Sequence, residues 1–536
     1  MQRGSCLLKS RQSVLEKFEV VVGQENVKSD AASLAPYYWS TIPAEREVLA
    51  VVQAADTGQV QKIVCLAGRL GISIFPISRG NNWGYGSALP PNNGAVVLDL
   101  RGMNRVLSVN EELAYAEIEP GVTQGQLFEY LIENKLALQL TPTGAGPEGS
   151  IVGNILERGF SLGPLGDRFG ALCSMEIVMP DGEILRTGFS RLTEGEIACS
   201  YSYGVGPYLD GIFSQSSLGI VTKMGIWLER KPECLKLCYF SFHDHKLESV
   251  VDTIRSLIQN GSFPGMMNLI SKSRILCSHG QYPWSEMEDQ IPLSEQYFEA
   301  LGQEMNIPDW VGIAPCFGTK FQMRALAQEL KHALSKKVIR LHFLSNRSLY
   351  FFDLKNRVLG GLGFAQRDIG SAGLKEFLKI FNGEPSEVSL SVPYWRNRDV
   401  HAPRSGINPA RDNCGLIWVT PTIPITGRHL CDFLKLVEPI FEHYGFELSA
   451  CFSAVQSRSF VCTLPILYDK SDLNEQHRAK ECHDMLVTVC TNRGFPPYRS
   501  GLLPSKRLFP EGDTYMKVLR KLKSSLDPNN VIASRL

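Results

Sequence analysis

Excess charge of either sign is absent from this chain of 536 residues, which has 55 Lys and Arg residues and 55 Asp and Glu residues. Proteins that bind nucleic acids or anionic membranes commonly carry a basic surface, so this balance argues against both kinds of partner. No apolar run approaches the length of a membrane span, and the N-terminal region does not match a signal peptide. The composition therefore predicts neither membrane insertion nor secretion.

Metal-binding and disulfide patterns are also missing. The 14 cysteines are scattered without repeated CxxC pairs, and the 10 histidines show no HExxH or comparable spacing. Zinc sites and small disulfide-bonded scaffolds normally show such spacings. We therefore expect no dedicated metal site and a reducing, cytoplasmic location.

A segment rich in glycine and asparagine, residues 76–86, follows an apolar run at residues 72–75 that predicts a buried strand. A second predicted strand, residues 95–100, comes soon after. Because glycine has no Cβ, the backbone N–H groups of such a loop can turn toward one anion, and a diphosphate is the anion that most needs this. Ordinary turns have a similar composition, so this loop alone does not decide between the two interpretations.

A second glycine cluster, residues 144–170, favours the ligand-binding interpretation over an ordinary turn. So many glycines in one stretch raise the entropy cost of folding, and a flat ligand lying against the backbone would explain them. The two clusters together favour a dinucleotide site. It is not a Rossmann site, because no GxGxxG stands between a strand and a helix with an acidic residue about 20 residues later.

The chain length suggests two or three domains. Apolar residues at helical spacing predict a helix over residues 57–71, and a Pro-Asp-Gly turn predicts a hairpin over residues 175–187. A further helix is predicted at residues 123–135, with Leu127, Phe128, Leu131 and Ile132 facing inward. Short strands that alternate with helices indicate a mixed α/β region, and longer helical patterns after Arg230 indicate a second domain.

Several motifs in order resemble the FAD-dependent oxidases and dehydrogenases typified by vanillyl-alcohol oxidase and 4-cresol dehydrogenase. The resemblance is closest at residues 203–216, Tyr-Gly-Val-Gly-Pro-Tyr-Leu-Asp-Gly-Ile-Phe-Ser-Gln-Ser, and covers most of the chain, with a looser match in the middle. The other matching segments are residues 76–86, 97–107, 118–123, 149–154, 157–159, 166–167, 182–188, 218–228, 383–386, 497–499 and 526–530.

The family implies an α+β fold of two domains. The FAD-binding domain, of the p-cresol methylhydroxylase type, would consist of two α/β subdomains over residues 1–232 and be completed by residues 490–536. A substrate (cap) domain would span residues 233–489. The resemblance implies FAD contacts in the glycine-rich segments and their neighbours: Pro76, Ile77, Ser78, Arg79, Gly80, Asn81, Asn82, Gly84, Tyr85, Gly86, Pro142, Gly149, Ser150, Gly153, Asn154, Glu157, Gly159, Gly166, Asp167, Gly219, Ile220, Val221 and Arg499.

The resemblance also places Tyr85, Tyr498 and Arg499 where family members hold a phenolate. Removing a hydride from a benzylic carbon is easier when a para hydroxyl is ionised, because a neutral quinone methide results. A free phenol has a pKa near 10, so the site must supply positive charge and hydrogen-bond donors. Asp167 matches the acidic residue that the family places near flavin N5, although an aspartate here could instead cap the turn that follows.

One departure from the family concerns covalent attachment of FAD. The strand at residues 413–421 carries Leu416 where a His or Tyr would form the bond. We therefore expect non-covalent FAD. Cys414 is an alternative attachment point, although a buried structural cysteine is the more common state.

These observations predict an FAD-dependent oxidoreductase that acts on the side chain of a para-substituted phenol or similar acidic aromatic. Oxidation of a non-phenolic alcohol, lactone or 2-hydroxy acid is the alternative, since Arg499 could equally bind a carboxylate. A catalytically silent binding protein of the same fold is a third. The electron acceptor, oxygen or a protein, stays open, as does a homodimeric state, which is common in the family.

Overall fold

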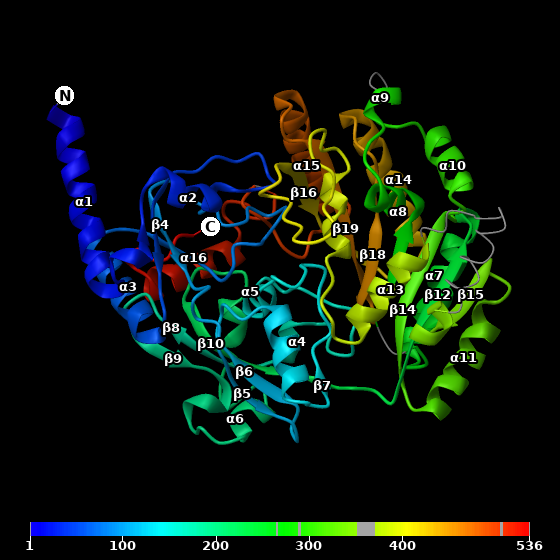
Figure 1. Ribbon diagram of the computed structural model, residues 1–536, viewed down its shortest axis with the longest axis horizontal. Coiled ribbons are helices and arrows are strands. Elements are labelled where there is room, and N and C mark those ends of the chain that lie inside the picture. Colours follow the sequence, from blue (N-terminus) through cyan, green and yellow to red (C-terminus); the bar gives the residue numbers. More distant parts are fainter. Residues whose placement is uncertain (1, 264–265, 288–290, 351–369, 504–506, 535–536) are drawn as a thin grey trace.

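The computed structural model describes residues 2–263, 266–287, 291–350, 370–503 and 507–534. Figure 1 shows two groups of elements side by side, one containing the N-terminal half and the C-terminus, the other containing most of the second half. The helices other than those introduced below are α1 (Gln2–Val22), α2 (Ala31–Tyr38), α6 (Ile197–Ser200), α9 (Trp284–Met287), α10 (Glu295–Glu304) and α13 (Gly370–Phe381).

The first sheet has four strands in the order β1 (Val27–Lys28), β2 (Val48–Gln53), β4 (Ala95–Asp99) and β3 (Ile74–Ile77). The strands β2, β3 and β4 are parallel. The predicted helix is α3 (Thr57–Leu70), which connects β2 to β3 and buries Val60, Ile63, Val64 and Ala67. Because parallel strands share one carboxyl edge, the loop after β3 lies where open α/β sheets bind ligands.

The second sheet is antiparallel, in the order β5 (Val106–Asn110), β6 (Tyr115–Ile118), β10 (Ile220–Trp227), β8 (Leu172–Val178) and β9 (Ile184–Arg186). The predicted hairpin is confirmed as the pair β8 and β9. The helix α4 (Gln124–Glu133) is also present, but Ile132 is 48% exposed, so its predicted inward position is wrong. The buried stripe of α4 is narrower than the sequence indicated, since Leu127 and Leu131 are buried while Phe128 is only half-buried.

The third sheet belongs to the second half of the chain. Its main path is β15 (Arg340–Leu344), β12 (Cys234–Phe242), β14 (Trp310–Gly318), β13 (Asn268–Ser271), β18 (Cys451–Gln456), β19 (Ser459–Asp469) and β16 (Cys414–Val419), and β17 (Thr422–Pro424) pairs with β19. The helices near it include α7 (Leu247–Gln259), α8 (Lys272–His279), α11 (Lys320–Leu334), α14 (Gly427–Tyr444) and α15 (Leu473–Asn492). A small pair of strands, β7 (Leu138–Gln139) and β11 (Glu229–Arg230), lies just before this half begins.

The C-terminal segment returns to the first half of the chain, as the two ends in Figure 1 show. After α16 (Thr514–Leu526), the N–H of Ile74 donates to the carbonyl of Val531 at 2.6 Å, and the N–H of Ala533 donates to the carbonyl of Ile74 at 2.8 Å. These contacts join the C-terminal segment to the first sheet, and the division at residues 232/233 and 489/490 stays a prediction.

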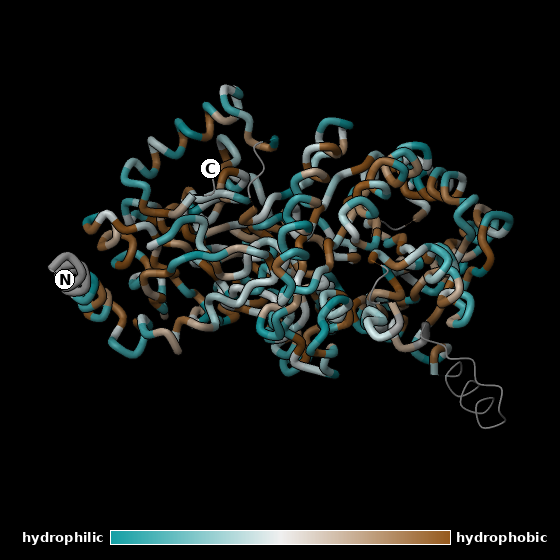
Figure 2. The backbone as a smooth tube through the Cα atoms, turned by 90° about the horizontal axis from the view of Figure 1, so that it is seen from above, coloured by the Kyte–Doolittle hydropathy of each residue, from teal (hydrophilic) through white to brown (hydrophobic). Residues whose placement is uncertain are grey.

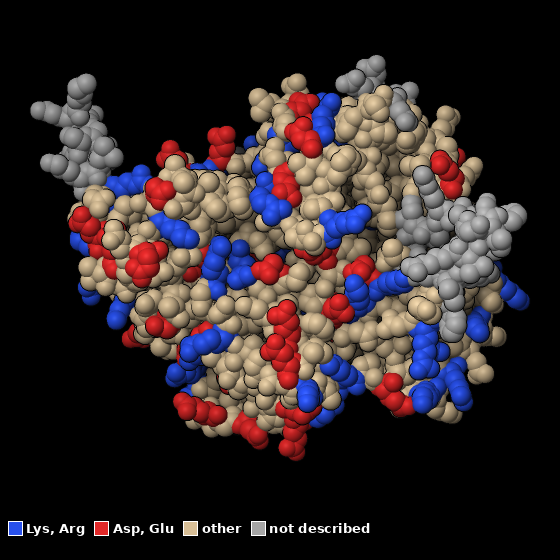
Figure 3. All heavy atoms as spheres, in the orientation of Figure 1, with Lys and Arg blue, Asp and Glu red and all other residues tan. Residues whose placement is uncertain are grey.

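Apolar and charged residues are distributed as in a globular protein. In Figure 2 the hydrophobic colour follows the inner strands and the inner faces of helices. On the face shown in Figure 3, basic and acidic side chains are interspersed, as the balanced composition predicts. Among the described residues, no helix is both long and apolar enough to cross a membrane, and no three His, Cys, Asp or Glu side chains gather as metal ligands.

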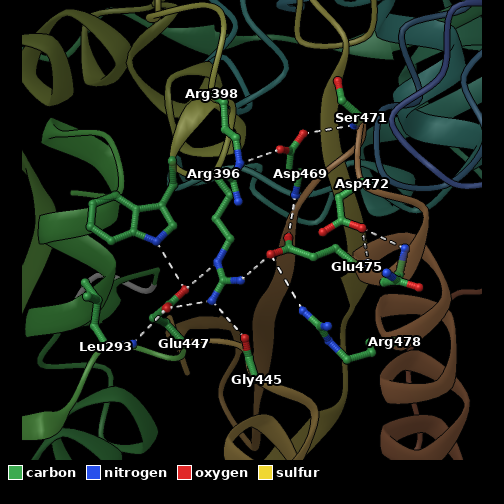
Figure 4. Close-up of polar contacts among 12 residues, drawn as sticks. Leu293, Arg396, Arg398, Gly445, Glu447, Asp469, Ser471, Asp472, Glu475 and Arg478 are labelled. Atoms are coloured by element: carbon green, nitrogen blue, oxygen red, sulfur yellow. Dashed lines mark hydrogen bonds and ion pairs between the residues drawn. The ribbon is translucent and has the colours of Figure 1, made fainter. Parts of the chain in front are cut away.

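A buried ion cluster stabilises the second half (Figure 4). The guanidinium of Arg396, which is fully buried, donates to Glu447 at 2.7 Å and to Glu475 at 3.2 Å, and also to the carbonyl of Gly445 at 2.8 Å. Burial alone would lower the pKa of Arg396, but the two carboxylates raise it overall. The cluster connects the loop before β16 to the loop before β18 and to α15, and it shows how this fold satisfies a structural arginine.

Candidate functional site

A cavity of about 490 Å³, here called the central cavity, lies between the glycine-rich loops and the third sheet. One wall comes from the loop after β3 and from residues 143–160, including α5 (Ile151–Leu156). The opposite wall comes from β16, β18 and α8. Elements from three distant parts of the sequence therefore converge on one space.

Most of the residues predicted to contact the cofactor line this cavity. They are Pro76, Ile77, Ser78, Arg79, Gly80, Asn81, Asn82, Tyr85, Gly149, Ser150, Gly153, Asn154, Glu157, Gly159, Gly219, Val221 and Arg499. Six predicted residues lie outside its lining: Gly84, Gly86, Pro142, Gly166, Asp167 and Ile220.

Gly84 has a structural reason to be glycine. Its φ is +75°, and a Cβ there would lie 2.2 Å from Cδ1 of Trp418 on β16. The N–H of Trp418 also donates to the carbonyl of Gly84 at 3.2 Å. The glycine therefore lets the loop after β3 pack directly against the third sheet, which closes the cavity on that side.

Unsatisfied polar atoms in the lining indicate that the cavity is built for a polar ligand. The Oγ of Ser87 and the Oδ1 of Asn154 are buried and have no hydrogen-bond partner among the described residues. Such groups are costly unless a ligand or water satisfies them. Together with the glycine-lined walls, they fit FAD: residues 76–82 and 149–154 would hold its diphosphate side.

Tyr85, Tyr498 and Arg499 form one cluster in the lining. The guanidinium carbon of Arg499 lies 3.7 Å from the ring centre of Tyr85 and 5.6 Å from that of Tyr498. The hydroxyl of Tyr85 donates to Oγ1 of Thr420 at 3.2 Å, and the N–H of Tyr498 donates to the carbonyl of Thr420 at 3.1 Å. Two segments, the one after α15 and the one after β16, therefore hold the two tyrosines beside one cation.

The electrostatics of this cluster suit an anionic ligand. Burial raises the pKa of Tyr498, although the charge of Arg499 opposes that shift. Burial tends to lower the pKa of Arg499, but Tyr85, Tyr498 and Glu157 raise it overall. Arg499 therefore stays cationic and Tyr498 stays protonated, so the cluster presents a fixed charge and a hydroxyl donor. The Nε of Arg499 is buried without a partner in the described part of the chain.

Asp167 lies elsewhere. Its side chain is exposed, and its Oδ1 accepts a hydrogen bond from the N–H of Gly170 at 3.2 Å. This is the turn cap that the sequence analysis held as the alternative to a role near the flavin. The neighbouring Gly166 packs against Met266 rather than the cavity. The motif Gly-Asp thus marks a packed turn in this structure.

The strand expected to attach FAD carries no suitable nucleophile at the cavity. Leu416 and Trp418 line the cavity, whereas Cys414 does not. The thiol of Cys414 is buried beside the amide of Asn397, at 3.4 Å, and burial raises its pKa to about 12. A thiol in that state is a poor nucleophile.

Sequence reasoning missed the residues that the third sheet and its helices contribute. These are mainly Asn268, Arg274, Trp418, Thr420, Cys451, Ser453 and Thr463. They lie in the region where the resemblance is loosest, and each looks like an ordinary strand or helix residue in the sequence. Only the alternation along β16, β18 and β19 could have indicated which side chains face the cavity.

Comparisons with known proteins identify the family of the chain. Residues 48–188 match the FAD binding domain family. The chain is 34% identical over 529 residues to 1'-carboxy-chondrochloren decarboxylase of Chondromyces crocatus, covering 97% of this chain and 96% of the relative. It is 27% identical over 532 residues to the 4-cresol dehydrogenase [hydroxylating] flavoprotein subunit of Pseudomonas putida, covering 97% and 94%.

A solved structure of p-cresol methylhydroxylase with substrate bound superposes with a TM-score of 0.86, at 26% identity, over 97% of this chain and 95% of that one. The fold, the FAD-binding domain and the near-complete overlap with these relatives lead to one assignment. The chain is an FAD-dependent oxidoreductase and belongs to the p-cresol methylhydroxylase-type family of FAD-linked oxidoreductases.

Proposed function

We propose that the enzyme oxidises the side chain of a para-substituted phenol bound in the central cavity. The observation that carries this proposal is the cluster of Tyr85, Tyr498 and Arg499, in which a buried cation stacks on one tyrosine and adjoins a second. A phenolate oxygen placed there would receive a hydrogen bond from the hydroxyl of Tyr498, a second from Tyr85 in exchange for its bond to Thr420, and charge stabilisation from the guanidinium.

The geometry supports the following roles. Arg499 lowers the pKa of the bound phenol, because its charge favours the anion in a site that is largely shielded from water. Tyr85 and Tyr498 orient the phenolate oxygen, which fixes the ring and its para side chain in the cavity. When bound, FAD supplies the acceptor for the hydride that leaves the benzylic carbon, and a neutral quinone methide results. Because Asp167 lies outside the cavity lining, no acid–base step is assigned to it.

A second candidate function is oxidative decarboxylation, favoured by the 34% identical relative that is named a decarboxylase. If the carbon next to the oxidised one carries a carboxylate, the quinone methide can lose carbon dioxide. The bond to the carboxyl carbon breaks, its electron pair forms a C=C bond, and the ring becomes a phenolate again. Atoms and charge balance without another reactant.

Other parts of the proposal concern partners and location. The FAD-binding domain would span residues 1–232 and 490–536, and the substrate domain residues 233–489. The substrate is proposed to be a small aromatic molecule, as the names of the p-cresol relatives suggest for those proteins. The described cysteines are free thiols, which supports a reducing, cytoplasmic location.

The test is anaerobic mixing of the holoenzyme with para-alkylphenols, para-hydroxyphenyl acids and small 2-hydroxy acids, following the flavin absorbance. Bleaching by the phenols supports phenol oxidation, and carbon dioxide release with the acids supports the second candidate. Bleaching by a non-phenolic hydroxy acid, with none by any phenol, would contradict both.

A further inference from the structure

Arg274, in the first turn of α8, is a half-buried cation that lines the central cavity. Its side chain is part of the cavity lining, and its guanidinium carbon lies 5.3 Å from the ring of Trp418. Its Nη1 is buried and has no hydrogen-bond partner among the residues that the structure describes. Burial lowers the pKa of Arg274, and the groups that oppose this shift are Cys451, Cys277 and Cys462.

The same half of the protein shows how an arginine is satisfied when its role is structural. Arg396 is fully buried, and Glu447 and Glu475 neutralise it (Figure 4). A buried charge without a counterion is costly, and a fold tolerates it where a ligand supplies the missing partner. Arg168 is also buried with free Nη atoms, but it lies outside the cavity lining and has Glu229 near it.

A chain of contacts connects Arg274 to the cluster of Tyr85, Tyr498 and Arg499. Arg274 stacks on Trp418, and Trp418 packs against Gly84, the neighbour of Tyr85 on which Arg499 stacks. Arg274 and Arg499 therefore line one cavity from two distant parts of the chain, α8 and the segment after α15, while a third lining arginine, Arg79, is paired with Glu148. One of them, Arg499, is already assigned to the phenol oxygen.

We propose that Arg274 binds a carboxylate of the substrate, so that the substrate class is a para-hydroxyphenyl compound with an anionic side chain. This inference rests on the proposed function, because it takes the phenol oxygen to be at Arg499. A planar guanidinium can hold a carboxylate through two parallel hydrogen bonds, which an amide or an alkyl chain cannot reproduce. The carboxylate would neutralise the charge of Arg274, as Glu447 neutralises that of Arg396.

The experiment compares three probes of similar shape on the holoenzyme: para-hydroxyphenylpropanoate, its primary amide and para-propylphenol. Dissociation constants come from the change in flavin absorbance on binding, and reduction rates from anaerobic mixing. The wild type should bind the acid about 10- to 100-fold more tightly than the amide, the range of one charge-assisted contact. Arg274→Met should remove this preference while it leaves the FAD content unchanged, and Arg274→Lys should retain part of the preference.

Arg398→Met is the matched control, since Arg398 also stacks on an indole, that of Trp284 at 3.7 Å, but pairs with Asp469. It should keep the full preference for the acid. Equal binding of acid and amide by the wild type, or an unchanged preference in Arg274→Met, would overturn the inference. Loss of FAD in Arg274→Met would instead assign the cation to the cofactor and would also overturn it. Para-propylphenol has no carboxylate, so its failure to reduce the flavin counts against the proposed function alone.

Discussion

Replacing Arg499 with lysine keeps the positive charge but removes the planar group that stacks on Tyr85. The guanidinium carbon is 3.7 Å from that ring and 5.6 Å from Tyr498, so its plane is fixed by both rings. An ammonium group has no fork of parallel donors and cannot stack in this way. The loss of one charge-assisted contact in a water-poor site is worth about 2–4 kcal/mol, or roughly 30- to 1000-fold in rate.

The assay is single-turnover reduction of the flavin by a para-alkylphenol without oxygen. Arg499→Lys should slow reduction by that factor while the FAD content and the melting temperature stay close to the wild-type values. Arg493→Lys is the matched control, since Arg493 is exposed and lies just after α15. Its reduction rate should equal that of the wild type. If Arg499→Lys reduces within about threefold of the wild-type rate, the guanidinium does not hold the phenolate and the reasoning is wrong.

Three further predictions concern the cofactor, the turn and the buried ion cluster. Because Leu416 occupies the attachment position, acid precipitation should leave the yellow colour in the supernatant, and colour retained in the pellet would contradict this. Asp167→Asn should change the reduction rate by less than about twofold, because asparagine can cap the same turn; a loss above tenfold would return Asp167 to the reaction. Glu447→Ala should lower the free energy of unfolding by about 3–5 kcal/mol, since it leaves the buried charge of Arg396 partly uncompensated. Glu481→Ala, at an exposed position, is its control in thermal unfolding, and equal melting temperatures would refute the estimate.

Local signals in the sequence predicted much of the first half. The helix α3 follows from its apolar spacing, and the pair β8 and β9 follows from the turn at Asp181 and Gly182. Tyr85 and Tyr498 are far apart in the sequence, and no local pattern places them together. Only the resemblance to a family indicated that they share one site.

The rest depends on tertiary packing. Asp167 reads as a ligand-loop residue in sequence, but in the structure its exposed carboxylate caps the turn at Gly170 and lies outside the cavity lining. Arg274 lies at the start of an amphipathic helix and has no distinctive neighbours in sequence. Its proposed role can be inferred only from the structure, in which its Nη1 is buried without a hydrogen-bond partner among the described residues. A pattern of apolar residues records what a helix packs against, but not which polar group is left without a partner.

The most direct test of the central claim is the ionisation state of a phenol bound to the holoenzyme. A para-halogenated phenol with no oxidisable side chain would be titrated into the protein at neutral pH, well below a free phenol pKa near 10. We predict the absorbance of the phenolate in the difference spectrum, because Arg499 and the two tyrosine hydroxyls lower the pKa of the bound phenol. A spectrum of the neutral phenol on binding, or no binding at all, would contradict the account.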